Sequence, residues 1–314
     1  MNLSVEQDVF GTSCKIFGTT HFVVTKLPSD EIRVNHAAVI VLNVVLIIPT
    51  IMLNAVAIIT IWNSSQMNSK PCYFVVVVQS AIDLAVGVFG IPLFVVFLLS
   101  AMGNMSNCFV ATLAYRLTIV PIGLSTIALI AMTVERYIAI LHPYSYISLM
   151  TKRKVMIIVL CGGALEFPVH VLSLSVHGLL HSYSSIKVVL SFFFIAIVYT
   201  RIYLVVRKLS RSKNRMHDSF SQENLTKRKS FLQEIKQAKS CFIVVICFFV
   251  LGVIPTPITR AVLQTPDQFE ELEISVWAVT LSLCISSVDS VIFFWMKAML
   301  RKEAVKMMNK ICLI

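Results

Sequence analysis

Charged residues are scarce in this chain of 314 residues, of which 14% are Asp, Glu, Lys or Arg and 57% are hydrophobic. Soluble domains carry about 25% charged residues on average. The shortage of charge therefore excludes an ordinary soluble domain and favours a protein that lies within a lipid bilayer.

Features that would indicate other classes of membrane protein are also absent from the sequence. The eight cysteines have no metal-ligand spacing and the seven histidines are scattered, so we expect no enzyme. The sequence shows neither the internal repeats of transporters nor the filter motifs of channels. A seven-helix membrane transporter or channel is kept as the alternative to the interpretation below.

Seven apolar segments are long enough to cross a bilayer, which takes about 20 residues. Because the bilayer core offers backbone groups no water, these spans must be helical. The sequence thus predicts an all-α membrane protein, a seven-transmembrane helix bundle over residues 37–297, preceded by an extracellular segment 1–36 and followed by a cytoplasmic tail 298–314. We place the spans at 37–62, 73–100, 108–139, 155–178, 183–206, 239–262 and 274–297.

Basic residues gather in alternate loops, most densely over 207–239, whereas the segment 267–273 before the last span is acidic. The positive-inside rule makes the basic side cytoplasmic and puts the N-terminus outside. Because residues 1–36 lack the apolar core of a signal peptide, the first span is expected to act as the signal. We therefore expect a multi-pass plasma-membrane protein whose net charge of +11 contacts anionic lipid and not nucleic acid.

Three modifications are indicated outside the spans. Asn2 and Asn104 begin glycosylation sequons on the predicted outer side, where Cys14 and Cys108 are the two cysteines able to form a disulfide. After residue 297, apolar residues recur at helical spacing between lysines, which predicts a short amphipathic helix on the inner leaflet. Cys312 in that helix is either palmitoylated or an unmodified thiol.

Polar residues recur at fixed places in the spans. The run Glu135-Arg136-Tyr137 stands at the inner end of the third span, where charges are costly unless they are paired or used. The other spans contain Asn54, Asp83, Tyr199, Phe249, Pro255, Asp289 and Phe293. Together these positions resemble those of the rhodopsin-like G-protein-coupled receptors, over residues 37–310.

The resemblance implies a receptor that passes the binding of an extracellular ligand to heterotrimeric G proteins. Outward movement of the sixth helix, kinked at Pro255, would free Arg136 from Glu135 to contact a G protein and Tyr199. The implied activation residues are Glu135, Arg136, Tyr137, Tyr199, Phe249, Pro255, Asp289 and Phe293. Arrestin and receptor kinases are implied as further partners, with phosphorylation expected in the loop 207–238.

Asp83 lies halfway along the second span, where an unpaired carboxylate would be costly. The resemblance places Asn54, Ser125, Ser286 and Asp289 around it, together with a sodium ion. Oxygen ligands suit a hard cation, so one hypothesis is a sodium site formed by Asp83, Ser125, Ser286 and Asp289. The alternative is a protonated Asp83 within a hydrogen-bonded polar core.

The ligand stays open at this point. Residues 83–92 and 199–204 resemble adenosine receptors, whereas the very short second outer loop without cysteine is similar to that of melanocortin receptors. The ligand residues of those branches do not transfer, so the ligand is an adenosine-like or other small molecule, or a peptide. The pocket residues implied by the resemblance are Arg116, Thr118, Ile119, Ile122, Val253, Arg260, Ser282 and Leu283.

Arg116 lies 20 residues before Arg136, so it stands about 30 Å nearer the outer mouth of the bundle. Three interpretations of this cation are open. It forms an internal ion pair with Glu166, it binds an anionic group of a ligand, or it extends its charged end to the membrane surface.

Overall fold

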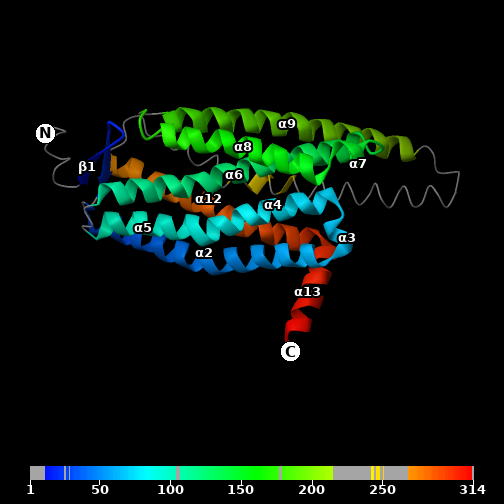
Figure 1. Cartoon of the computed structure of the whole chain (residues 1–314), viewed down its shortest axis with the longest axis horizontal. Coiled ribbons are helices and arrows are strands. Elements are labelled where there is room, and N and C mark those ends of the chain that lie inside the picture. Colours follow the sequence, from blue (N-terminus) through cyan, green and yellow to red (C-terminus); the bar gives the residue numbers. More distant parts are fainter. Residues whose placement is uncertain are drawn as a thin grey trace.

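A bundle of long helices, preceded by a two-stranded hairpin, makes up the described part of the chain (Figure 1). The computed structural model describes residues 11–24, 26–27, 29–103, 107–176, 179–214, 242–243, 245–247, 250 and 268–312. Within them, 6 helices are long and apolar enough to cross a membrane. They correspond to six of the seven predicted spans, and most of the other, at 239–262, lies outside the described residues.

The helix α6 (Cys108–Leu141) is the central element of the bundle, because among the described residues it packs most extensively against four other helices. These neighbours are α4 (Pro71–Ala85), α5 (Ile91–Met102), α8 (Lys152–Leu172) and α9 (Leu179–Asn214). One π-helical turn, η1 (Val86–Gly90), joins α4 to α5, so the predicted second span is continuous but locally widened and underwound. On the other side of α4 and α5 lie α2 (Asp30–Asn63) and α12 (Gln268–Met296).

Polar side chains fix the starts of three long helices. Ser29, Asn107 and Thr151 each accept a hydrogen bond from a backbone N–H in the first turn of α2, α6 and α8. The helix α8 ends at Leu172, earlier than the predicted residue 178, because the chain turns at once and begins α9 at residue 179. The predicted very short connection between these two spans is therefore confirmed.

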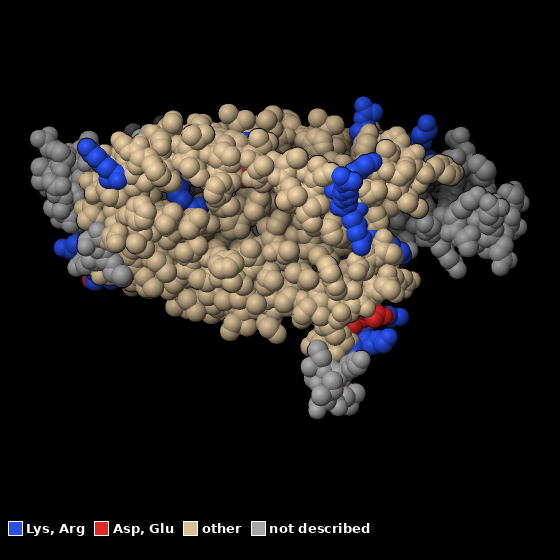
Figure 2. All heavy atoms as spheres, viewed as in Figure 1, with Lys and Arg blue, Asp and Glu red and all other residues tan. Residues whose placement is uncertain are grey.

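Charged side chains lie mainly towards the two ends of the bundle, and a broad uncharged zone separates them (Figure 2). Large apolar side chains such as Ile48, Leu160 and Phe193 are exposed on the outside of the helices. This distribution suits lipid contact around the middle of the bundle. We call the end of the bundle that carries β1 the hairpin end, and the opposite end, which carries α13, the α13 end (Figure 1).

Two large clusters of buried apolar side chains form most of the core, and a small third cluster of Val23, Cys108 and Ala111 lies where the hairpin meets α6. The α13-end cluster includes Met132, Tyr199, Ile202, Phe293 and Leu300. The hairpin-end cluster includes Val39, Ile91, Phe94, Val279 and Leu283.

The N-terminal segment contains a hairpin that the all-α prediction did not include. Strands β1 (Gly11–Ile16) and β2 (Thr19–Val24) pair antiparallel, with Ile16 opposite Thr19. The two linking residues, Phe17 and Gly18, have φ angles of 47° and 84°. Two positive φ values in a two-residue loop are typical of the tight turn that matches the twist of a hairpin.

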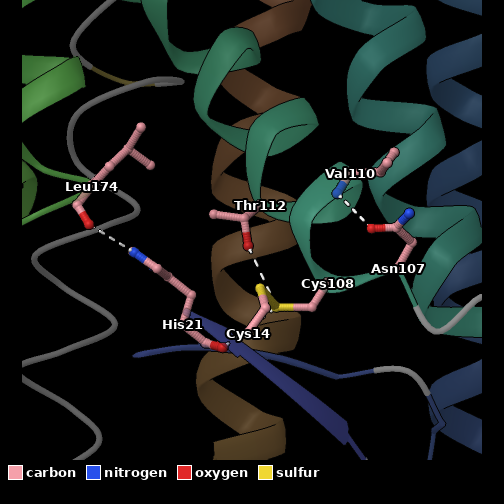
Figure 3. Close-up of a disulfide and its surroundings, with 7 residues drawn as sticks. All are labelled: Cys14, His21, Asn107, Cys108, Val110, Thr112 and Leu174. Carbon is pink, nitrogen blue, oxygen red and sulfur yellow. Dashed lines mark hydrogen bonds between the residues drawn. A yellow bond between two sulfur atoms is a disulfide. The ribbon is translucent and has the colours of Figure 1, made fainter. Parts of the chain in front are cut away.

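A disulfide between Cys14 of β1 and Cys108, the first residue of α6, anchors the hairpin to the bundle (Figure 3). The hypothesised pairing is therefore confirmed. The hairpin also contacts the turn after α8, where His21 Nε2 lies 3.0 Å from the Leu174 carbonyl oxygen and the Thr19 hydroxyl donates to the Ser175 carbonyl at 2.6 Å. The hairpin thus spans from α6 to the α8–α9 connection.

Replacing Cys14 with serine is expected to destabilise the folded chain by about 2–5 kcal/mol, because the unfolded chain loses a cross-link between distant residues. Cys108→Ser should have the same effect, and the double variant should be no worse than either single one. Thermal unfolding of the purified chain measures this. Cys161→Ser is the control, since Cys161 is a free, exposed cysteine. Unchanged melting of both single variants would contradict the prediction.

The short helix α13 (Ala298–Cys312) leaves the bundle at the end opposite the hairpin (Figure 1). Its Leu300 and Ala304 are buried. The Tyr73 hydroxyl of α4 donates to Met299 Sδ at 3.7 Å, which ties the start of α13 to the bundle. The amphipathic helix is present where the sequence predicts it, and part of its apolar face packs on protein.

Candidate functional site

The charged pair near the α13 end of α6 is almost completely buried. Glu135 and Arg136 are 1% and 2% exposed. The Arg136 guanidinium donates from Nε and Nη2 to the two carboxylate oxygens of Glu135. Such a bidentate pair engages both carboxylate oxygens and two N–H groups of the guanidinium, so Glu135 stabilises Arg136 in its buried position.

Tyr146 is a further partner of Glu135 that sequence reasoning missed. It begins the short helix α7 (Tyr146–Leu149), and its hydroxyl donates to Glu135 Oε1. Burial, followed by the charge of Glu135, raises the pKa of the Tyr146 hydroxyl well above its usual range. The hydroxyl therefore keeps its proton at physiological pH and always acts as a donor. No sequence signal distinguishes this tyrosine from others in the loop.

Other predicted activation residues lie at the same end of the bundle. Tyr199 of α9 and Phe293 of α12 are buried in the α13-end cluster, and Tyr137 packs against it. The ring centroids of Tyr199 and Phe242 are 5.0 Å apart. Three helices, α6, α9 and α12, thus bring these side chains to the end where Arg136 lies.

A second group of polar side chains is buried between α2, α4, α6 and α12. This polar core consists of Asn54, Gln79, Asp83, Ser125, Ser286 and Asp289. It includes all four residues predicted for the sodium site. Asn54 links α2 to α12, because its Nδ2 donates to the Ser286 carbonyl at 3.1 Å and its Oδ1 accepts from the Ser290 hydroxyl at 2.6 Å.

Gln79 lies in the middle of the polar core, although the sequence analysis did not single it out. Its Nε2 is 2.7 Å from Ser125 Oγ, 3.2 Å from Asp83 Oδ2 and 3.4 Å from Asp289 Oδ2. Gln79 precedes Asp83 by one helical turn, and this spacing, which puts both on one face of α4, is the signal that could have found it. Sodium binds oxygen ligands, whereas here amide hydrogens face the oxygens. The position between these three oxygens therefore does not fit a sodium ion.

Several of the residues predicted for the ligand pocket make packing contacts or hydrogen bonds within the bundle. Leu283 lies in the hairpin-end cluster, and Ile119 and Ile122 pack against it. The buried Thr118 hydroxyl lies 2.9 Å and 3.2 Å from two backbone carbonyl oxygens, one of them in η1. The Ser282 hydroxyl donates to a carbonyl of its own helix at 2.9 Å. The structure therefore brings Ile119, Ile122 and Leu283 together, whereas the hydroxyls of Thr118 and Ser282 bond to backbone.

Arg116 does not form the ion pair with Glu166 that the sequence left open. Its Nη1 donates to the Ser173 hydroxyl at 3.0 Å. Glu166 pairs instead with Lys187 of α9, with Nζ and Oε1 2.7 Å apart. The reason is the position along α6, since Glu166 lies beside Gly123, which is about 10 Å further along the helix than Arg116.

Several predicted residues lie outside the described part of the chain or have side chains that it does not describe. The helix α13 ends at Cys312, whose side chain is outside the described part. The residues outside the described part are Asn2, Asn104, Phe249, Val253, Pro255 and Arg260.

Comparison with known proteins gives two similarities. Residues 53–182 match the model of the family described as 7 transmembrane receptor (rhodopsin family). Olfactory receptor 4K17 of Homo sapiens is 27% identical over 138 residues, which are 44% of this chain and 40% of that receptor. The matched part of the chain thus spans about two fifths of the length of that relative. The family match covers the polar core residues of α4 and α6 and the buried Glu135–Arg136 pair.

Proposed function

We propose that this chain is a seven-transmembrane receptor of the rhodopsin family, which passes the binding of an extracellular ligand to a heterotrimeric G protein. The match of residues 53–182 to that family supports the proposal. The observation that carries the proposal is the buried Glu135–Arg136 pair near the α13 end of α6. Charges inside a membrane helix bundle are costly unless the protein uses them. A bundle that has two arrangements, and meets a different partner at each end, can carry such a signal.

In the resting arrangement, Arg136 is held by Glu135, and Glu135 is held in turn by Tyr146. Activation moves the sixth span, predicted at 239–262, away from α6. Arg136 then leaves Glu135 and contacts the G protein and Tyr199. Receptor kinases and arrestin act on the basic loop 207–238 once the receptor is active.

We place the hairpin outside the cell and α13 in the cytoplasm, with the receptor in the plasma membrane. Three observations support this orientation. The hairpin and α13 lie at opposite ends of the bundle (Figure 1), the hairpin carries a disulfide of the kind that forms in oxidising compartments, and the basic loops follow the positive-inside rule. In this orientation Asn2 and Asn104 are glycosylation sites, and Cys312 is a palmitoylation site at the inner leaflet.

The ligand binds towards the hairpin end, near Ile119, Ile122 and Leu283. We place the receptor near the adenosine and melanocortin branch on the resemblance of residues 83–92 and 199–204. The ligand is a small molecule or a peptide, bound with the help of Arg116, Val253 and Arg260.

Arg136→Ala tests the proposal. Receptor-dependent changes in cAMP and calcium, measured on overexpression and normalised to surface receptor, should fall at least about tenfold, because losing a buried charged partner costs about 2–5 kcal/mol. Arg153→Ala is the matched control, since Arg153 is an exposed arginine in the first turn of α8. Full signalling by Arg136→Ala, at equal surface expression, would overturn the proposal.

A further inference from the structure

Three helices meet at a single side-chain amide in the polar core. Gln79 of α4 is completely buried. Its Nε2 lies within hydrogen-bond distance of oxygens from α4, α6 and α12, namely Asp83 Oδ2, Ser125 Oγ and Asp289 Oδ2. A glutamine amide nitrogen carries two hydrogens and accepts none, so it can serve three oxygens only by sharing a hydrogen between two of them.

The amide nitrogen stands where a cation would have to stand. An ion bound by Asp83 Oδ2, Ser125 Oγ and Asp289 Oδ2 together would need a position close to all three oxygens. Nε2 holds that position, at 2.7 to 3.4 Å from each of them. Since an N–H group repels a cation, ion and amide cannot occupy this position together.

The charge of the two carboxylates must still be balanced. None of the ion pairs among the described residues involves Asp83 or Asp289. An amide is uncharged, and two ionised carboxylates so deeply buried would repel each other. The arrangement that agrees with the geometry has a proton held by the carboxylate pair and the amide donating to both.

We propose that Gln79 is a built-in, uncharged substitute for the cation, which joins α4, α6 and α12 and makes the folded state of this receptor indifferent to sodium. The cation that the family resemblance implies at Asp83 is thus replaced by a side chain of the protein itself. The proposal concerns the polar core and does not require the proposed coupling to G proteins.

The test is thermal unfolding of the purified full-length chain in sodium chloride and in N-methylglucamine chloride at equal ionic strength. The wild-type chain should melt at the same temperature in both salts. Gln79→Leu removes the amide and leaves the oxygens of Asp83, Ser125 and Asp289 free for an ion. Its melting temperature should rise by about 3 °C as sodium reaches saturation, since an ion that binds the folded state alone stabilises it.

Two controls make the result specific. Gln66→Leu makes the same chemical change on an exposed glutamine of α3 (Ser65–Asn68) and should show no sodium response. Adding Asp83→Asn to Gln79→Leu should abolish the response. If Gln79→Leu does not fold, Gln79→Met takes its place. The comparison of the wild-type chain in the two salts tests the proposal in either case.

Two results would overturn the inference. One is a saturable rise in the wild-type melting temperature with sodium that Asp83→Asn removes, because an ion would then bind beside Gln79. The other is a folded Gln79→Leu variant that does not respond to sodium, because Gln79 would then not be what excludes the ion. Since the assay contains neither ligand nor G protein, its failure is distinct from a failure of the proposed signalling function.

Discussion

Replacing Glu166 with alanine should destabilise the folded bundle by about 3–5 kcal/mol, because it would leave a charged Lys187 largely buried and without its partner. Glu166 is 1% exposed, and Lys187 Nζ lies 2.7 Å from its Oε1. The Tyr183 hydroxyl donates to the same oxygen at 3.1 Å. The carboxylate therefore holds two polar groups of α9 against α8, and its removal leaves both unsatisfied.

The surroundings of the pair leave it little freedom to rearrange. A Cβ atom added to Gly123 of α6 would lie 2.7 Å from Glu166 Oε2 and 3.3 Å from Lys187 Nζ. The absence of a side chain at Gly123 thus makes the room in which the pair lies against the central helix. A lysine that has lost Glu166 would have to move its charge towards lipid or towards the ends of the bundle, at a further cost.

The control is a double variant, Glu166→Leu with Lys187→Met. Replacing a buried ion pair by apolar residues of similar volume is often close to neutral, so the double variant should recover most of the stability lost in Glu166→Ala. Glu31→Ala, at an exposed glutamate of α2, should melt like the wild-type chain. The prediction fails if thermal unfolding places Glu166→Ala within about 1 kcal/mol of the wild type, the range of a surface pair.

The apolar patterning was enough to predict the 6 membrane-length helices that the structure describes. The third span, predicted at 108–139, is α6 at Cys108–Leu141, because length and hydrophobicity alone determine which segments can cross a bilayer. The hairpin was missed for the opposite reason, since two six-residue strands in a polar segment have no such signal. The two-residue link Phe17-Gly18 between alternating runs is the local pattern that indicates it.

Pairings between helices were harder to predict than the helices themselves. The sequence showed that Arg116 and Glu166 are unusual in their spans, but not how α6 and α8 are placed along each other. Glu166 lies about two helical turns further along α6 than Arg116. At that level its partner is Lys187 of α9 and not Arg116. In the polar core, the carboxylates were recognised by their charge, whereas the neutral Gln79 became apparent only from the three oxygens around it.

Glu135→Gln should raise ligand-independent signalling on the order of tenfold, which corresponds to a shift of about 1.4 kcal/mol between the two arrangements. An amide accepts through one oxygen and carries no charge, so Arg136 loses its bidentate ionic partner in the resting arrangement. In the proposed active arrangement Arg136 contacts the G protein and not Glu135, so that arrangement should lose nothing. The measurement is basal cAMP and calcium, normalised to surface receptor.

The neighbouring tyrosine provides a graded control. Tyr146→Phe removes the hydroxyl that donates to Glu135 but leaves the ionic pair intact, so basal signalling should rise less than in Glu135→Gln. Because the raised pKa of Tyr146 keeps this hydroxyl protonated, its contribution should not vary with pH across the physiological range. Combining Glu135→Gln with Arg136→Ala should abolish the increase, since in the proposed function the freed Arg136 guanidinium engages the G protein. Basal signalling that stays at the wild-type level in Glu135→Gln would mean that the pair does not restrain Arg136.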